Sequence, residues 1–481
     1  MSSASEARPL FETHGIDYIP PEARHGKAWT LLTFWAGTNV MILAISTGAL
    51  AVIVGLSLPW AIAAIVIGNL AGGVYMALHS VQGPRMGIPQ MMQSRAQFGM
   101  YGAALPNVIV VLMYIGYFVS GVILGGQAVA SLLHVTTSEG IIIMAAIILV
   151  VCWFGYDLFH RFNIVSVILS TAIFLALLVD LATLVPGHLP PATGDTPGNI
   201  LLAISFSVAW QVTYAPYVSD YSRYLPEETP GWKTFLYTYL GAVLGTTLSM
   251  VVGALAAVVA LAPVSANAPN YLSGLLTAKW LFLLVFVIGT VASMYENLYG
   301  PFLTFFAVVS PSGAMAGQKT GRRARFISTF VFAVIGAIIA IYASPHFITD
   351  LSNFLVFTLY LLIPWTAINL TDFYLVRHAR YDIPELFKVD GKYGKVNWFA
   401  ILVFALTVGV ELPFMNDPAI FVGPVATAMG GADIAWIVGF IFGGLCYYVG
   451  ARLGWAGARE SASLEFEPVA AVPVGAEEGG G

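Results

Sequence analysis

The residue best suited to chemistry in this sequence is Glu296, near the middle of a long apolar run over residues 280–308. If that run spans a membrane, a carboxylate at this depth is costly unless it is paired, solvated or protonated. Glu296 could therefore carry a coupling proton or accept hydrogen bonds from a polar ligand. The alternative is a structural carboxyl group bonded to a neighbouring helix.

The neighbouring Asn297 offers both a hydrogen-bond donor and an acceptor, as a heteroaromatic base would require. Adjacent residues of a helix point about 100° apart. Only one of the two side chains therefore faces a ligand squarely, and Ser293, one turn earlier, is the competing candidate.

Two polar interruptions of apolar runs are the second candidate site. They are Ala-Gly-Thr-Asn at residues 36–39 and Gln-Val-Thr-Tyr-Ala-Pro at residues 211–216. Each alone is explained by small residues that pack helices closely or by a proline kink. Together, at matching positions in two halves, they favour broken helices around a transporter's binding site. The polar residues that they offer to a ligand are Thr38, Asn39 and Gln211.

Aromatic side chains gather near these two interruptions. Trp35, Tyr114, Tyr117, Trp210 and Tyr214 lie deep within their apolar runs. Such rings can sandwich a planar ligand, although each ring taken singly is more often part of helix packing. Their concentration favours stacking of Trp210 and Tyr117 on a ligand.

No motif for enzymatic or ATP-driven chemistry is present. The sequence has no phosphate-binding glycine loop with lysine, no HExxH or GxSxG pattern and no Cys/His metal spacing. Its two cysteines, Cys152 and Cys446, lie in separate apolar runs, where thiols usually pack as small hydrophobes. We therefore expect neither an enzyme nor a cofactor. Any transport against a concentration gradient must be driven by a gradient of H+ or Na+.

The composition identifies the elements that position these residues. Of 481 residues, 58% are hydrophobic and 9% are charged, against about 25% charged residues in soluble domains. This excludes a soluble enzyme, a nucleic-acid-binding protein and a secreted disulfide scaffold. A bilayer core needs about 20 apolar residues per helix, and twelve such runs occur. They cover residues 30–55, 58–81, 105–133, 139–157, 163–185, 199–222, 233–261, 280–308, 326–343, 351–376, 396–414 and 432–455.

The basic residues orient these runs. With the N-terminus inside, 19 of the 20 Lys and Arg residues fall on the inner side and only Lys279 falls outside, as the positive-inside rule requires. No signal peptide is expected. The sequence predicts a multi-pass protein of the cell inner (plasma) membrane with both termini in the cytoplasm. Its predicted parts are a cytoplasmic tail (1–28), a five-helix repeat (29–185), a second, inverted five-helix repeat (199–376), two accessory helices (396–455) and a disordered cytoplasmic tail (456–481).

The loop after the second run carries the most specific pattern. Residues 83–99 read Gly-Pro-Arg-Met-Gly-Ile-Pro-Gln-Met-Met-Gln-Ser-Arg-Ala-Gln-Phe-Gly. This resembles the pattern G-P-[RK]-x-G-x-x-Q-M-x-x-S-R-x-x-F-G of the nucleobase–cation symporter family 1, in its purine–cytosine permease branch. Physically it is an amphipathic cytoplasmic stretch, in which Arg85 and Arg95 are expected to stay among lipid headgroups. Shorter matches lie at residues 17–20, 35–48, 123–127 and 220–226.

The resemblance implies an all-α, leucine-transporter-like fold with 12 transmembrane helices, of which ten form a 5+5 inverted repeat and two are accessory. Family members bind a planar base between helices 1, 3, 6 and 8. Carried over to this sequence, the binding residues are Gly37, Thr38, Asn39, Tyr114, Tyr117, Trp210, Gln211, Thr213 and either Ser293 or Asn297. Glutamine or tryptophan is common where this chain has Tyr114 and Tyr117, and fungal members have Pro-Asn in place of Glu296-Asn297.

The same resemblance bears on the coupling ion. Some relatives build a sodium site from carbonyl groups of helix 1 and paired Ser/Thr hydroxyls of helix 8. The corresponding pair here is apolar, at residues 287–288 or 291–292, with Thr290 and Ser293 nearby but unpaired. Because hard cations want several oxygen ligands, the sequence favours proton coupling through Glu296.

We therefore expect a secondary active transporter that imports a nucleobase or a related planar heterocycle, cytosine or a purine first, by symport with H+. Access to a mid-membrane site would alternate between the two sides. The alternative is a Na+-coupled symporter of a vitamin pyrimidine, a hydantoin- or allantoin-like ring, or a nucleoside. A passive channel is a different class, but the polar residues cluster at one depth. Expected partners are the small nucleobase-like substrate and the lipid bilayer, and no nucleic acid.

Overall fold

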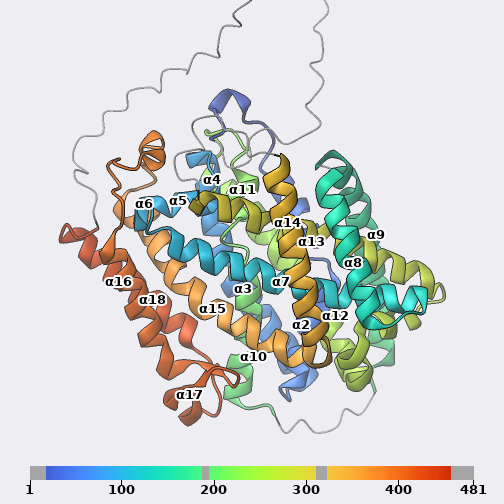
Figure 1. Ribbon diagram of the computed structural model, residues 1–481. Helices are drawn as coiled ribbons and strands as arrows, with labels where there is room; N and C mark the ends of the chain where they lie inside the picture. The colour runs from blue at the N-terminus through green and yellow to red at the C-terminus, as the bar shows by residue number, and fades with distance from the viewer. Residues whose placement is uncertain (1–17, 155, 187–193, 310–321, 457–481) are drawn as a thin grey trace, which may run out of the picture.

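The computed structural model describes residues 18–154, 156–186, 194–309 and 322–456 (Figure 1). Most of the predicted terminal tails, residues 1–17 and 457–481, lie outside this part of the chain. The described residues are mainly helical, with one hairpin of β1 (Asn416–Asp417) and β2 (Phe421–Val422). The α-helices are α1 (Thr30–Thr38), α2 (Ile42–Ile53), α3 (Leu58–Ser80), α4 (Gln82–Met86), α5 (Gln90–Gln93), α6 (Arg95–Phe98), α7 (Ala104–Leu133), α8 (Thr137–Phe154), α9 (Tyr156–Leu184), α10 (Pro197–Val212), α11 (Val218–Ser222), α12 (Gly231–Gly274), α13 (Lys279–Val309), α14 (Arg322–Ala343), α15 (Phe347–Thr371), α16 (Trp398–Glu411), α17 (Pro424–Ala428) and α18 (Ala435–Arg452).

Each of the twelve apolar runs predicted from the sequence contains a helix. Among the described residues, seven helical stretches are long and apolar enough to cross a membrane, or eight if the bent pair α1 and α2 is one span. That count treats Phe326–Val376, which holds α14 and α15, as one stretch. It leaves out three shorter apolar helices, at Thr137–Trp153, Pro197–Val212 and Trp398–Phe414. The number of twelve spans therefore stays a prediction.

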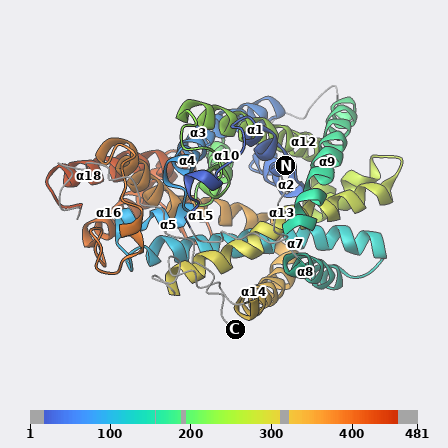
Figure 2. The same cartoon turned by 90° about the horizontal axis from the view of Figure 1, so that it is seen from above.

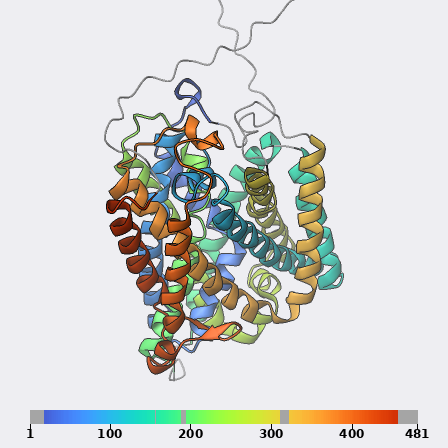
Figure 3. The same cartoon turned by 60° about the vertical axis from the view of Figure 1, so that its left-hand side comes forward.

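The helices pack in three groups (Figure 2). In the first bundle, α12 packs against α1, α2 and α3, and α10 packs against α3. In the second group, α13 lies along α7, and α8, α9 and α14 pack beside them. The third group is α15, α16 and α18, and its orange and red C-terminal helices stand at one side of the molecule in Figure 3. The first bundle meets the second group where α9 and α13 approach α1 and α2.

Small residues of α12 allow the first bundle to pack closely. A Cβ atom on Gly245 would lie 2.3 Å from the carbonyl oxygen of Ala36, and one on Gly253 would lie 1.9 Å from that of Ile45. Ser249 lies midway between these glycines, so small residues recur every fourth position. This spacing lets helix backbones approach one another in membranes. The small face of α12 therefore runs along both α1 and α2.

The helix α12 is longer than the run predicted over residues 233–261. It continues to Gly274 through non-helical backbone at Ala260 and Asn267. Pro263 and Pro269 follow these two points, and proline disrupts the preceding helical turn without preventing a new one. The apolar run therefore ends near the first break, whereas the helical backbone continues past it.

The motif over residues 83–99 folds into the three short helices α4, α5 and α6 at one end of the first bundle. Arg85 is exposed, but Arg95 is buried, with 1% of its surface exposed. The Arg95 guanidinium donates to the carbonyl oxygen of Leu386 at 3.2 Å and lies 5.7 Å from the centre of the Phe387 ring. The prediction that both arginines stay among lipid headgroups was wrong for Arg95, because the segment after α15 covers it.

We predict that Gly253→Ala destabilises the protein by about 1–3 kcal/mol, the usual cost of overpacking. The new Cβ atom cannot avoid the Ile45 carbonyl group unless a backbone moves. The measurement is the unfolding temperature of the purified protein in detergent. Gly409→Ala on α16 is the matched control, since nothing lies within 4 Å of a Cβ atom there. Equal unfolding temperatures for the two variants would contradict the packing argument.

Candidate functional site

Both interruptions predicted from the sequence are present. The helix α1 ends at Thr38 and α2 begins at Ile42, with the two helices bent by 65°. In this break the backbone carbonyl of Asn39 accepts a hydrogen bond from the Ser249 hydroxyl at 2.9 Å. The second break lies between α10 and α11, where residues 213–217 form turns. The two non-helical segments lie inside the protein, where such backbone is tolerated.

A small cavity lies where the first break faces α9 and α13. Its volume is about 20 Å³, which is room for one water molecule. Typical ligand pockets are at least ~300 Å³, so the site is closed around a much smaller space in this conformation. Four predicted site residues meet here, namely Gly37, Thr38, Ser293 and Glu296. The other lining residues are Val40, Met41, Val167, Ser170, Gly289 and Ala292.

Glu296 supplies the charge of this cavity. The hydroxyls of Thr38 and Ser293 donate to backbone carbonyls one turn earlier on their own helices, at 2.9 and 3.0 Å. The hydroxyl of Tyr221, on α11, is hydrogen-bonded to the Glu296 carboxylate. Within the described part of the chain, no three His, Cys, Asp or Glu residues could hold a metal ion together. The Glu296 carboxylate therefore links α13 directly to the second break.

On α13, Ser293 and Glu296 lie three residues apart and both reach the cavity, as that spacing on one helix face allows. Asn297 is not among the lining residues. It is 7% exposed, and its side-chain nitrogen donates to the backbone carbonyl of Ser293 at 3.1 Å. In this conformation the helix therefore presents Ser293 and Glu296 to the cavity rather than Asn297.

Aromatic rings form a layer beside the second break. The centres of the Tyr117 and Trp210 rings are 5.9 Å apart at an interplanar angle of 86°, and the Tyr117 hydroxyl is hydrogen-bonded to the Thr213 hydroxyl at 2.8 Å. Tyr214 lies 6.3 Å from Trp210, and Tyr217 lies 5.5 Å from Tyr214. These contacts are edge-to-face or tilted. The two predicted stacking residues therefore touch each other, and neither is among the residues that line the small cavity.

Tyr114 joins this layer to α13. Its ring lies 5.4 Å from that of Tyr217 and packs on Gly300, where a Cβ atom would lie 2.5 Å from the tyrosine ring. The sequence analysis missed Tyr217 and Tyr221 as neighbours of the site. An available signal was their position, since both tyrosines follow closely after the predicted interruption at residues 211–216.

Asn39 and Gln211 do not line the cavity. Both are fully buried and face the interior of the first bundle. The side-chain oxygen of Asn39 accepts a hydrogen bond from the Trp210 indole at 2.8 Å, and Gln211 donates to the side-chain oxygen of Asn69 at 2.9 Å. These two polar residues therefore hold the helices around the breaks together.

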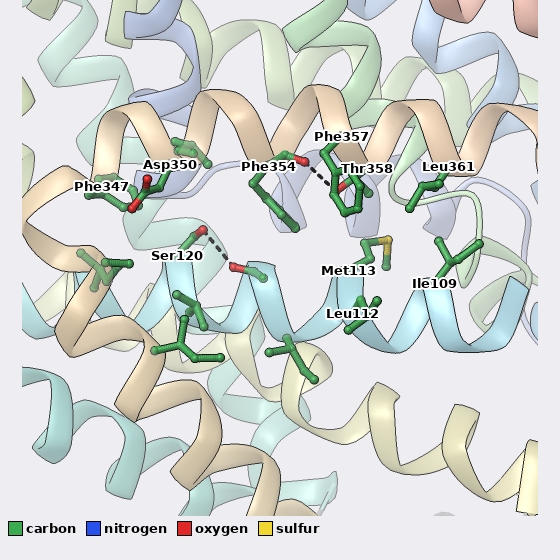
Figure 4. Close-up of a pocket in the computed structure, with 17 residues that line it drawn as sticks. Ile109, Leu112, Met113, Ser120, Phe347, Asp350, Phe354, Phe357, Thr358 and Leu361 are labelled. Atoms are coloured by element: carbon green, nitrogen blue, oxygen red, sulfur yellow. Dashed lines mark hydrogen bonds between the residues drawn. The ribbon is translucent and has the colours of Figure 1, made fainter. Parts of the chain in front are cut away.

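A larger cavity of about 390 Å³ lies between α7, α14 and α15 (Figure 4). Its walls are mainly apolar. Ser120 and Thr358 contribute hydroxyls, but each donates to a backbone carbonyl one turn earlier, at 2.9 and 2.6 Å. The ring of Phe354 stands between this cavity and Tyr117, with centres 5.1 Å apart. The carboxyl group of Asp350 also lines this cavity, and the rest of its lining is mainly apolar.

At the end of the molecule that carries the motif, Asp372 is the centre of a buried polar cluster. Its carboxylate accepts hydrogen bonds from Arg377, Tyr381, Tyr447 and Gln97, at distances between 2.8 and 3.1 Å. The Asp372 side chain is 0% exposed and that of Arg377 is 12% exposed. One carboxylate thus ties α6, the end of α15, the following loop and α18 together.

Asp220 and Arg223 lie near the same end of the molecule, at the end of the predicted run over residues 199–222. Asp220 accepts a hydrogen bond from the backbone N–H of Gln90 at 2.7 Å, and the Arg223 guanidinium donates to the backbone carbonyl of Asp220 at 3.3 Å. The first of these contacts connects α11 to α5 of the motif. The side chain of Asp157 lies outside the described residues.

We predict that Asp372→Asn lowers the free energy of unfolding by about 3–5 kcal/mol, because Arg377 would keep a buried charge without its partner. The measurement is again the unfolding temperature in detergent, together with the yield of folded protein. Asp390→Asn removes an exposed carboxylate that pairs with Lys395, and exposed pairs contribute about 0–1 kcal/mol. An equally large loss of stability for Asp390→Asn would show that burial of the Asp372–Arg377 pair does not explain the effect of Asp372→Asn.

The chain is similar to known transport proteins along most of its length. Residues 18–439 match the model of a family described as permeases for cytosine/purines, uracil, thiamine and allantoin. The Bacillus subtilis protein YxlA, which carries the name of a purine-cytosine permease, is 40% identical to this chain over 445 residues. The matched residues cover 91% of this chain and 95% of that protein.

Two solved structures of the transporter Mhp1 share the fold. The inward-facing structure has a TM-score of 0.74 at 17% identity and covers 93% of this chain and 95% of that one. A second is described as a nucleobase–cation–symport-1 family transporter in a closed conformation with bromovinylhydantoin bound. It has a TM-score of 0.71 at 19% identity and covers 93% of this chain and 96% of that one.

Proposed function

Because the chain belongs to the family of permeases for cytosine/purines, uracil, thiamine and allantoin, we propose that it imports a nucleobase or a related planar heterocycle by cation symport. Cytosine and the purines are the first candidates. The family predicted from the motif over residues 83–99 is confirmed, and the protein is a permease rather than an enzyme. The observation that carries the proposal is the cavity in which Glu296 meets the first break, with Tyr221 hydrogen-bonded to Glu296.

In the proposed bound state, Trp210 and Tyr117 separate and stack on the two faces of the base. Glu296 accepts hydrogen bonds from its polar edge, with the break residues Gly37 and Thr38 beside it. Two observations support this arrangement. The two rings are already in contact, and Glu296 lines the cavity at the break. Stacking on aromatic rings and a few placed polar groups are what a planar heterocycle needs.

We further propose that twelve helices span the inner membrane, with ten in a 5+5 inverted repeat and both termini in the cytoplasm. The breaks after α1 and α10 support this, because they fall in the first and sixth of the twelve predicted spans. The distribution of Lys and Arg residues supports the orientation. In such folds the two halves rock against each other and expose the central site alternately.

The coupling ion that we propose is H+, carried by Glu296. Glu296 is the ionisable residue among those that line the cavity at the first break, and the sequence lacks the paired Ser/Thr residues that would add the several oxygen ligands Na+ requires. The second candidate is Na+-coupled transport of a vitamin pyrimidine, a hydantoin- or allantoin-like ring, or a nucleoside. The uptake experiment below separates the two, and saturable counterflow separates both from a passive channel.

We predict that the purified protein in proteoliposomes accumulates at least one radiolabelled nucleobase when a proton gradient alone is imposed. The panel comprises cytosine, uracil, adenine, guanine, hypoxanthine, thiamine, allantoin and a hydantoin. Sodium and proton gradients are applied separately, and empty liposomes are the control. Accumulation under a sodium gradient alone would contradict proton coupling. Absence of accumulation for the whole panel would contradict the proposed function.

We predict that Glu296→Gln abolishes uptake driven by a proton gradient and leaves exchange of internal for external substrate. Glutamine keeps the shape and a hydrogen-bonding edge but cannot take up the proton. Glu411→Gln on α16 is the matched control, because Glu411 is also buried but lies away from the break. Full pH-dependent accumulation by Glu296→Gln would refute its role as the proton carrier.

A further inference from the structure

We propose that a buried polar network of Asn39, Asn69, Gln211 and Thr246 fixes the orientation of the Trp210 indole and so sets the affinity for the ligand. Asn69 and Thr246 are positioning residues in this proposal, and the sequence analysis singled out neither. The inference rests on the proposed function, in which Trp210 stacks on the base. All four network side chains are 0% exposed.

The hydrogen-bond directions of the network follow from one fixed end. The side-chain nitrogen of Asn69 donates to the backbone carbonyl of Ile65 at 3.0 Å, so its side-chain oxygen is left to accept from Gln211 at 2.9 Å. A second hydrogen on the same Gln211 nitrogen reaches the Thr246 hydroxyl oxygen at 3.1 Å. Because Thr246 receives this hydrogen, its own hydroxyl hydrogen points away from Gln211.

That hydroxyl hydrogen goes to Asn39, which is fixed from both sides. The Asn39 side-chain nitrogen donates to the backbone carbonyl of Trp35 at 2.8 Å. Its side-chain oxygen therefore faces the bundle, where it accepts from the Thr246 hydroxyl and from the Trp210 indole, each at 2.8 Å. The direction of the Trp210 N–H bond thus depends on an amide whose orientation Thr246 helps to hold.

The network joins four parts of the first bundle. Asn39 lies in the break after α1, Asn69 on α3, Gln211 on α10 and Thr246 on α12. Inside a protein, such bonds are stronger than in water and an unpaired polar group is costly. The Gln211 side-chain oxygen is buried without a partner in the described part of the chain, but the bonds that reach Trp210 run through Asn39 and Thr246. These bonds hold the Trp210 ring in one orientation relative to the break.

The test is Thr246→Val, which removes the hydroxyl at nearly constant volume. Gln211 keeps Asn69 and the carbonyl of Ala242, and Trp210 keeps Asn39, so the bundle retains partners for these groups. We expect the KM for uptake of the transported base to rise about tenfold, the equivalent of one lost hydrogen bond. We expect kcat to change less than about twofold, because Thr246 is not among the residues that line the cavity beside Glu296.

Two variants control for a merely structural effect. Thr246→Ser keeps the hydroxyl and should restore a KM close to that of the wild type. Thr247→Val alters the next residue, whose hydroxyl has no hydrogen-bond partner in the described part of the chain, and should leave KM unchanged. A wild-type KM for Thr246→Val, an equal rise for Thr247→Val, or a loss confined to kcat would overturn the proposal.

If the proposed function is wrong, the wild-type protein accumulates no member of the panel. This result is distinct from any effect of the Thr246 variants. The network is judged in that case from unfolding temperatures in a double-mutant cycle of Thr246→Val and Gln211→Leu. Non-additive losses are expected if the two side chains act together. Additive losses of stability would contradict the proposal that Thr246 and Gln211 act in one network.

Discussion

A chain that stops being helical inside a membrane must still pair its backbone polar groups within the protein, and the structure depends on that constraint. The break after α1 is covered by α12, whose Ser249 hydroxyl reaches the Asn39 carbonyl. Glycines one turn before and after Ser249 let α12 come close enough for this contact. The face of small residues on α12 therefore allows close packing of the bundle and also supplies a hydrogen bond to the backbone of the break.

The consequence is a site located between two groups of helices rather than within one. The break belongs to the first bundle, Glu296 belongs to α13 of the second group, and Tyr221 of α11 joins them. The cavity between them has a volume of about 20 Å³, so the proposed binding of a planar ring requires the two groups to separate. Edge-to-face contacts such as that of Tyr117 with Trp210 are worth about 0.5–1.5 kcal/mol beyond their buried area, which stacking on a ligand can replace.

The apolar runs, both breaks and Glu296 could be predicted from the sequence, because polar or helix-breaking residues stand out against an apolar background. The direction of each side chain could not. Asn39 and Gln211 have the right type and depth but face the bundle interior, because tertiary packing sets the rotation of a helix about its axis. Likewise, the burial of Arg95 depends on a segment almost 300 residues later in the chain.

The distribution of hydrogen bonds indicates where this molecule can open. Inside the first bundle, side chains of Asn39, Asn69, Gln211 and Thr246 bond helix to helix in a continuous series. Around the cavity, by contrast, Thr38 and Ser293 bond to their own helices. Tyr221 with Glu296 and Tyr117 with Thr213 form hydrogen bonds that cross there. Both bonds involve groups beside the proposed ligand site. A ligand with polar edges can therefore form hydrogen bonds in place of those that break when the site opens. Hydrogen bonds between helices therefore favour opening of the molecule between α13 and the first bundle over opening within that bundle.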